Sequence, residues 1–443
     1  MVREGETDGE KASGGRARPA IIEFPTLVQH AVEQFGTVFV NEPERRHFAE
    51  YLTGLLVAEK KTVAGINAEF AQTTDQSCLN RWITEVDWEA SKLNQQRLAW
   101  LQRDASTRYA PSGIIPLDNT LVDHAGKLLE DVGYFWDHAE QRPKIAHDYL
   151  IVNYVCPSGK HSALEFRRFR KREDCAATRA ELDARPGGSP AATAAEQQRA
   201  TFKTHTELCG ELIDWGVEAQ MPGTLTFDSY FTNAPVLNHI AGRQRAYVGD
   251  LKFNRKVWFR GVELRASEMA AQIGPELRKQ VKSGERTQWY FTCTLWLPQV
   301  THKGRVVILW DYWKSKEPVT ILITNQTHWE VTRVLRGYRG RWTGTETLHR
   351  DGKQHLGLGD CQLRSGEGQT RHFYLVLLVH SLLVAQLRQG RVCAWATETL
   401  TTIGEACRAV LRETLGKTIT WAIERATLDG WQPERIKAPL ALT

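Results

Sequence analysis

Residues 338–346 read Tyr-Arg-Gly-Arg-Trp-Thr-Gly-Thr-Glu, and Lys353 follows seven positions after the glutamate. We expect this segment to be a helix. Residues seven positions apart share one face of an α-helix, so Glu346 and Lys353 should point in the same direction. A carboxylate beside an ammonium group, with arginines and an aromatic ring just upstream, suits a metal ion on one side and a phosphate on the other. The segment therefore predicts the centre of a functional site.

Two aspartates upstream would complete a set of three carboxylates. Asp118 follows the apolar run 113–117, and Asp228 follows the run 224–227. Each also has an ordinary explanation, because Asp118 suits a turn and Asp228 could cap a following helix. Glu346 stands three positions after Thr343, which is the spacing of a capping box. Asp123 is a rival to Asp118, but it would follow the strand rather than end it.

The order of Tyr338, Arg341, Glu346 and Lys353 resembles the signature of the DDE transposases of bacterial insertion sequences. Two residues separate the tyrosine from the arginine and six separate the glutamate from the lysine, as in that family. Four residues rather than three separate Arg341 from Glu346, and Gly344 could absorb the extra residue because glycine tolerates unusual dihedral angles. Segments 117–120, 226–233 and 353–362 also resemble the family, so the resemblance covers roughly residues 110–385.

The resemblance implies an α/β (α+β) fold with an RNase H-like catalytic core. A β-rich insertion domain would interrupt that core, with helical regions at both ends. The expected divisions are a tail 1–20, a helical DNA-binding domain 21–110, core segments 111–252 and 327–390, the insertion 253–326 and a helical region 391–443.

The resemblance also implies a reaction and its partners. Asp118, Asp228 and Glu346 would be the catalytic residues and the ligands of two Mg²⁺ ions, for which Mn²⁺ is expected to substitute. The enzyme would cleave transposon ends to free a 3′-hydroxyl and transfer it directly into target DNA. The expected partners are double-stranded terminal inverted repeats and target DNA, bound by a homodimer on paired ends.

Further residues are candidates for DNA contact. The resemblance implies that Arg341 and Lys353 would hold phosphates at the transposon end and that Tyr338 would pack on the DNA backbone nearby. A tryptophan of the insertion would support a flipped base, and paired strand aromatics are otherwise core residues. The candidates are Trp289, Trp296, Trp310 and Trp313.

Basic clusters indicate a polyanionic partner, because each neutralised phosphate releases bound counterions. Residues 166–172 hold five cations, among them Arg167, Arg168, Arg170 and Lys171, and the alternative is a solvated face. Arg333, Arg336, Arg339 and Arg341 form a second cluster. The helical pattern at about 24–106 also has basic flanks and could hold DNA ends or support packing.

The remaining sequence predicts local structure along the core. A hairpin is expected from the runs 149–155 and 162–166, a surface loop at 176–200, a helix at 202–219 and a strand at 245–251. His138 and His147 are expected to be polar residues at strand edges rather than metal ligands.

Composition sets the broad class of protein. The 443 residues are 42% hydrophobic and 25% charged, with a net charge of +5, which is typical of a globular protein with two or three lobes. No apolar run approaches the ~20 residues of a membrane span. The eight cysteines lack a C-x-x-C pair, which favours reduced thiols in a cytoplasmic protein. The resemblance implies that this is the bacterial cytoplasm and that the protein is associated with the nucleoid. Two alternatives to a transposase are a catalytically silent DNA-binding protein derived from one and an RNase H-like nuclease without strand transfer.

Overall fold

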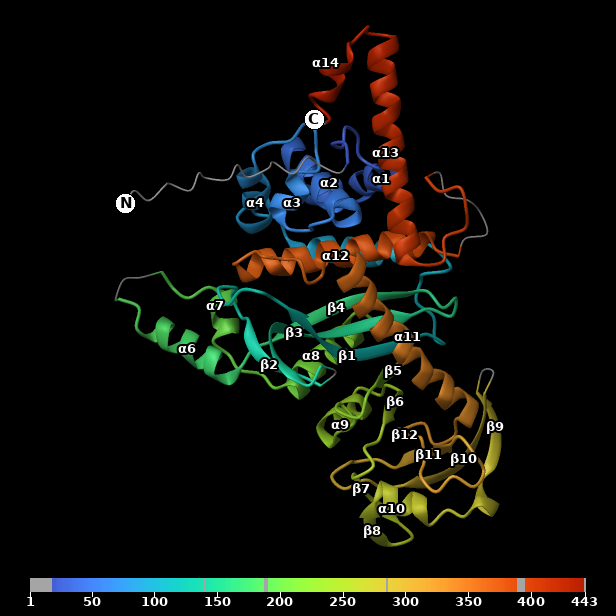
Figure 1. Cartoon of the computed structure of the whole chain (residues 1–443). Coiled ribbons are helices and arrows are strands. Elements are labelled where there is room, and N and C mark those ends of the chain that lie inside the picture. The colour runs from blue at the N-terminus through green and yellow to red at the C-terminus, as the bar shows by residue number, and fades with distance from the viewer. Residues whose placement is uncertain (1–17, 139, 187–189, 284–285, 389–394, 442–443) are drawn as a thin grey trace, which may run out of the picture. The chain divides into compact units, whose positions relative to one another are not determined.

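The computed structural model describes residues 18–441, except 139, 187–189, 284–285 and 389–394. The chain divides into two compact units (Figure 1). One unit combines residues 1–86 with 388–443, and the other comprises residues 87–387. Each unit is described by itself.

The first unit is helical, as expected for the N-terminal region. Its core brings together Phe39, Phe48, Tyr51 and Trp82, whose rings lie 4.8–5.9 Å apart. The long C-terminal helix packs on the N-terminal ones, where Glu413 accepts a hydrogen bond from the Thr26 backbone at 3.0 Å. The helices are α1 (Thr26–Phe35), the 3-10 helix Gly36–Val38, α2 (Glu42–Val57), α3 (Val63–Asn67), α4 (Gln76–Thr84), α13 (Ile403–Thr427) and α14 (Pro433–Lys437).

The second unit is built on a mixed sheet. Along the sheet the strands are β2 (Gly133–Asp137), β3 (Arg142–Val155), β1 (Ile114–Asp123), β5 (Thr224–Phe227), β6 (Tyr247–Asp250), β12 (Thr320–Thr324), β11 (Gly304–Trp310), β10 (Arg286–Leu295) and β9 (Lys279–Ser283). Strand β4 (His161–Phe169) also pairs with β3 and confirms the predicted hairpin. Strand β1 is antiparallel to β3 and parallel to β5, and β5 is parallel to β6. The order β4-β3-β1-β5-β6, with these directions, is that of an RNase H-like core.

Strands from the expected insertion extend this sheet. β12 pairs with β6, and β11, β10 and β9 follow outward from it. A separate two-stranded sheet, β7 (Lys256–Phe259) with β8 (Val262–Arg265), precedes helix α10 (Ala266–Ala271) and the 3-10 helix Pro275–Leu277.

Helices cover both faces of the central sheet. Alternation along β6 separates the faces, because Tyr247 packs with α8 (His205–Glu218) and α9 (Ala234–Gly242), whereas Val248 packs with the start of α11 (Val331–His355). The remaining helices are α5 (Ala90–Leu101), α6 (Arg172–Asp183), α7 (Ala194–Arg199) and α12 (Gly366–Gln386).

Two local predictions were wrong. The segment 176–200 is not simply a loop, because α6 extends into it and α7 forms within it. Its alanines favour a helix, and Thr193 with Glu196 forms a capping box at the start of α7. Strand β1 does not end at Asp118, because pairing with β3 continues as far as Asp123 opposite Ala146.

Helix α12 is a long helix that lies almost entirely inside this unit. It carries Arg371, His372 and His380, and nearly all of it is buried. Among the helices that the structure describes, none is both long and apolar enough to cross a membrane.

Candidate active site

Asp118 and Asp228 lie beside each other on neighbouring parallel strands. The register pairs Leu117 of β1 with Phe227 of β5, and each aspartate is the next residue. The parallel pairing stops there, so both carboxylates stand where the two strands diverge, as ligands do at the carboxyl ends of parallel strands. Strand β1 continues beyond Asp118 as the antiparallel partner of β3, but its parallel pairing with β5 ends just before Asp118.

Both aspartates face α11. Ile114 and Pro116 would be the nearest neighbours of side chains placed at Gly340 and Gly344, so they lie on the α11 face of β1. Because side chains alternate along a strand, Asp118 shares that face with Pro116. Asp228 faces the same way, because the register of β5 with β1 places it opposite Asp118.

Asp228 does not cap the helix that follows it. Its Oδ1 accepts hydrogen bonds from the backbone N–H groups of Tyr230, at 2.9 Å, and Phe231, at 3.3 Å. Helix α9 is capped instead by Asn233. Asp228 is therefore held in a tight turn that keeps its second oxygen clear of these backbone bonds.

Glu346 and Arg341 approach the aspartates from α11. Arg341 Nη1 donates a hydrogen bond to Asp118 Oδ2 at 3.0 Å. Glu346 is exposed and close enough for its negative charge to act on Asp118. The predicted arginine thus contacts the first acid across the helix–sheet contact, and the third predicted acid acts on it through its charge.

The extra residue between Arg341 and Glu346 is not absorbed at Gly344. Helix α11 is continuous from Val331 to His355, and Gly344 lies against Pro116, where an added Cβ would come within 2.6 Å of Cγ. At ~100° per residue, a five-residue step rotates Glu346 by about 140° from Arg341, against about 40° for a four-residue step. Arg341 therefore turns toward β1, while Glu346 remains at the exposed side of the helix.

The local charges strongly perturb Asp118. Burial raises the pKa of Asp118 to about 7, with a further contribution from the charge of Asp228, while the Arg341 guanidinium opposes the rise. Glu346 adds a smaller repulsion. Such a group is costly to ionise even beside Arg341, and a raised pKa of this kind is typical of functional carboxylates.

A fourth carboxylate, which the sequence analysis missed, borders the site. Asp250 ends β6, and the pairing of Phe227 with Gly249 places it next to Asp228. It accepts hydrogen bonds from Thr320 Oγ1, at 2.8 Å, and Tyr338 Oη, at 3.4 Å. Burial raises the pKa of Asp250, and these hydrogen bonds oppose the rise. Its signal in the sequence was the same as for the other aspartates, since it too ends an apolar strand.

The comparison with known families agrees with this geometry. Residues 34–290 match the family described as "DDE superfamily endonuclease". The chain belongs to that family. The match includes Asp118 and Asp228 and ends before Glu346. No curated protein matches the chain.

The acids of this DDE endonuclease suit a hard divalent cation. Mg²⁺ and Mn²⁺ prefer carboxylate oxygens, and Asp118, Asp228 and Glu346 offer only these. The Asp118 carboxylate has Arg341 as its cationic neighbour. Within the described part of the chain, no three Asp, Glu, His or Cys side chains stand close enough together to hold one ion. The donor chemistry therefore fits a divalent ion, for which the acids would have to draw closer.

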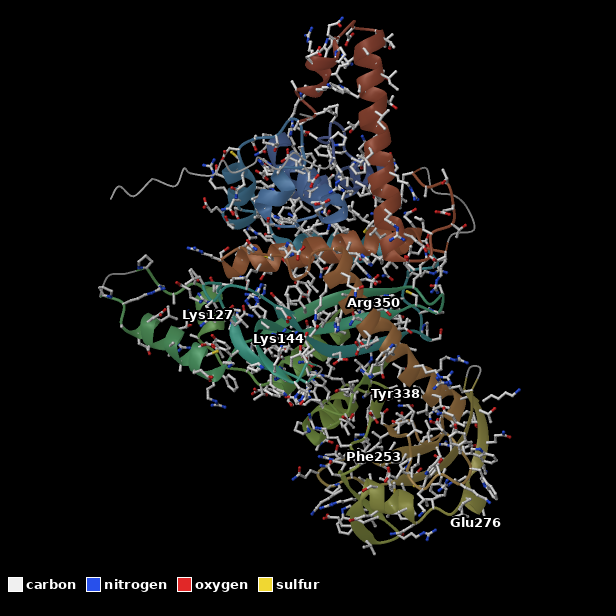
Figure 2. The ribbon with its side chains drawn as sticks, viewed as in Figure 1. Lys127, Lys144, Phe253, Glu276, Tyr338 and Arg350 are labelled. Atoms are coloured by element: carbon white, nitrogen blue, oxygen red, sulfur yellow. The ribbon has the colours of Figure 1, made fainter. Side chains whose placement is uncertain are left out.

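Lys353 lies in the last turn of α11. It is exposed, yet the surrounding chain limits the hydration of its ammonium group and so lowers the pKa of Lys353. The charge of Lys144 acts in the same direction. Lys144 itself bridges Asp123 and Asp137 at 2.8 Å each, so Asp123 is occupied by an ion pair beside the site. Figure 2 labels Lys144 on β3, and Tyr338 and Arg350 on α11.

The basic cluster at 166–172 is largely paired within the protein. Arg168 is buried and pairs with Asp131 at 3.1 Å, and Arg170 binds the same carboxylate at 2.9 Å. Arg167 lies 3.5 Å from Glu211, and Lys171 stands over the Phe135 ring. DNA contact by these four residues stays a prediction. The ion pairs of the three arginines and the ring contact of Lys171 give them a structural role as well.

The candidate tryptophans differ in exposure. Trp310 is fully buried, with the Arg278 guanidinium 4.0 Å from its ring centroid. Trp289 is half-buried and its ring lies 6.2 Å from that of Trp313. Trp296 is 43% exposed. Trp296 and Trp313 therefore offer ring surface to a base, whereas Trp310 contributes to the core, and base contact by any of them stays a prediction.

Proposed function

We propose that this DDE endonuclease is the transposase of a bacterial insertion sequence. It would cleave the DNA at the ends of its element to free a 3′-hydroxyl and transfer that hydroxyl directly to target DNA. The observation that carries the proposal is the register of β1 and β5, which sets Asp118 beside Asp228 on the face against which Glu346 is carried by α11.

Asp118, Asp228 and Glu346 would hold two Mg²⁺ ions, or Mn²⁺ in their place. When bound, such ions supply activation of the attacking hydroxyl or water and neutralisation of charge on the leaving oxygen. Because the ions would bind the scissile phosphate, the positions of the carboxylates would determine where that phosphate lies. Arg341 is placed to exchange its bond to Asp118 for one to a phosphate oxygen once the acids are otherwise neutralised. Lys353 and Tyr338 flank Glu346 along α11 and would position the same strand.

The proposed partners are the terminal inverted repeats and the target DNA. A homodimer on paired ends would allow both ends to be joined together. The enzyme would act in the bacterial cytoplasm on nucleoid DNA. These features follow from the resemblance to insertion-sequence transposases, and the charges of Arg341 and Lys353 near the acids support a DNA substrate.

The test is cleavage and joining of duplexes that carry the DNA flanking the gene, with Mg²⁺ or with EDTA. Wild type should nick the ends and form joined product only with Mg²⁺. Glu346→Gln should retain DNA binding and lose both products by a factor of about 10³ or more, since it removes a predicted metal ligand. Glu276→Gln is a matched control, because Glu276 is an exposed carboxylate outside the site.

Other outcomes would favour the alternatives. Nicking without any joined product would indicate an RNase H-like nuclease. DNA binding without cleavage by wild type would indicate a catalytically silent descendant of a transposase.

A further inference from the structure

A second basic site lies at the other end of the helix that carries Glu346. A cavity of about 650 Å³ opens beside the first turns of α11, which precede Tyr338 in the helix. The loop before the helix contributes His328 and Trp329, and the helix contributes Arg333 and Arg336. The starts of β1 and β5 close the cavity.

The charges of the two arginines of this cavity are not balanced by ion pairs in the part of the chain that the structure describes. Arg333 and Arg336 are both exposed, and neither has an acidic partner within ion-pair distance among the residues that the structure describes. Glu330 is the acidic residue in the lining, against the two arginines and His328. The balance of charge therefore favours an anion.

One of the arginines is held in place. The Arg333 guanidinium lies 3.9 Å from the centroid of the Trp329 ring, and Trp329 is itself buried. A guanidinium that lies over an aromatic ring keeps its N–H groups free, because they point outward in the plane of the guanidinium. It also loses little rotamer freedom when it binds a ligand. This geometry suits a phosphate group better than a mobile surface arginine would.

The distance from this cavity to the acids fits a DNA duplex that contacts both places. Ile114 lines the cavity and Asp118 is four residues further along β1, or about 13 Å at 3.3 Å per residue. Arg336 and Glu346 are ten residues apart on one continuous helix, or about 15 Å. The axis of a duplex rises about 3.4 Å per base step, so for a duplex that runs along α11 either span corresponds to about four base steps along that axis.

We propose that the cavity of Arg333 and Arg336 binds the phosphate backbone of the duplex whose cleavage site lies at Asp118 and Asp228, about four base steps from that site. The proposal rests on the proposed function for the identity of the DNA. The rigid helix would then fix the distance between the gripped phosphates and the cut. None of the four signature residues on α11 lines this cavity.

The experiment measures binding of a fluorescent duplex of the element's own end, in EDTA, over a range of salt concentrations. Each phosphate contact contributes about 0.9 to the slope of log affinity against log salt. Arg333→Gln/Arg336→Gln should lower that slope by about 1.8. Arg179→Gln/Arg260→Gln removes the same charge from two exposed arginines outside the cavity and should leave the slope unchanged.

A truncation series locates the contact. Duplexes shortened step by step on either side of the cleavage site should lose affinity for wild type when the fourth step is removed. The Arg333→Gln/Arg336→Gln variant should not respond to that removal. An unchanged slope, or an equal response to truncation in both proteins, would overturn the proposal. A slope change with a free nucleotide or inorganic phosphate but not with the duplex would overturn it as well.

Two features keep the result interpretable. Arg333→Lys/Arg336→Lys preserves the charges and should keep most of the slope, so a loss there would show a structural effect and count against the proposal. Binding in EDTA needs no catalysis. A wild type that binds the duplex but never cleaves it would therefore contradict the proposed function, while the slope would still decide the role of the cavity.

Discussion

Arg341 on helix α11 donates a hydrogen bond to Asp118 on strand β1, at 3.0 Å between Nη1 and Oδ2. The helix that carries the third acid thus also supplies the cation that faces the first. Both side chains are largely buried, with 13% and 14% of their surfaces exposed. A charge pair in this setting controls the protonation of Asp118 more strongly than a surface pair would.

Loss of Arg341 should shift the pH dependence of catalysis. The guanidinium lowers the pKa of Asp118, so Arg341→Gln should raise that pKa, which burial already places at about 7. At limiting Mg²⁺, the rise of cleavage rate with pH should then move upward by about one unit, because one unit corresponds to about 1.4 kcal/mol of lost interaction. The measurement is the rate of end cleavage from pH 6 to 9. An unchanged profile would mean that Asp118 ionisation does not limit the reaction.

Asp118 should also lower the stability of the metal-free protein above neutral pH. Its folded-state pKa of about 7 lies above the ordinary value of about 4, so the folded state holds a proton that the unfolded state releases. The free energy of unfolding should therefore fall as pH rises from about 4 to 7. Asp118→Asn removes this dependence and should be more stable than wild type at pH 8, by on the order of 2 kcal/mol.

Urea unfolding in EDTA at pH 5 and pH 8 measures this effect. The gap between Asp118→Asn and wild type should be larger at pH 8 than at pH 5. Asp183→Asn serves as a control, because Asp183 is an exposed carboxylate at the end of α6 and outside the site. A gap of the same size at both pH values would contradict the raised pKa.

The acids could be predicted because their signals are local. Asp118 and Asp228 each follow an apolar run, and the seven-residue step from Glu346 to Lys353 fixes a helix face. Asp250 carried the same signal and was missed, since the family pattern has no place for it. Its position beside Asp228 depends on the pairing of β5 with β6, which is a contact between distant segments.

Other features depend on tertiary pairing that local patterns do not contain. Strand β1 runs on to Asp123 because β3 continues beside it, although residues 118–120 suit a turn. Helix α11 stays regular through Gly344 because the glycine is packed against Pro116, although its sequence permits a bend. In both places packing decided between local conformations that were each acceptable.

Gly344→Ala should test the contact between α11 and β1. The added Cβ would lie 2.6 Å from Pro116 Cγ and 2.8 Å from Val155 Cγ2, so the helix or the strand must shift. Overpacking of this kind typically costs about 1–3 kcal/mol, and a shift of α11 would also displace Glu346. We expect lower stability in urea unfolding and a fall of cleavage rate by about 10-fold or more.

The matched control is Gly216→Ala in α8, where an added Cβ meets nothing within 4 Å. This change should stabilise the protein by about 0.5–1 kcal/mol, since alanine favours helix and restricts the unfolded chain. If Gly344→Ala also stabilised the protein, that result would contradict the close packing of α11 against β1.

Asp250 and Asp228 should differ sharply in their effect on catalysis, although they lie side by side. Both oxygens of Asp250 already accept hydrogen bonds, from Thr320 and Tyr338, whereas Asp228 uses one oxygen for its own turn. We therefore expect Asp250 to position Tyr338 rather than to bind metal. Asp228→Asn should lower the cleavage rate by about 10³ or more, while Asp250→Asn, which can still accept the Tyr338 bond, should lower it by less than about 10-fold.

Tyr338→Phe tests the same hydrogen bond from its other side, because it removes the hydroxyl that donates to Asp250. If Asp250 acts through Tyr338, then Tyr338→Phe and the double variant with Asp250→Asn should show similar rates and similar Mg²⁺ dependence. A large loss in Asp250→Asn that higher Mg²⁺ concentrations restore would instead make Asp250 a metal ligand. In that case Asp118, Asp228 and Asp250, at the ends of three adjacent parallel strands, would form the metal site, and Glu346 would serve the DNA.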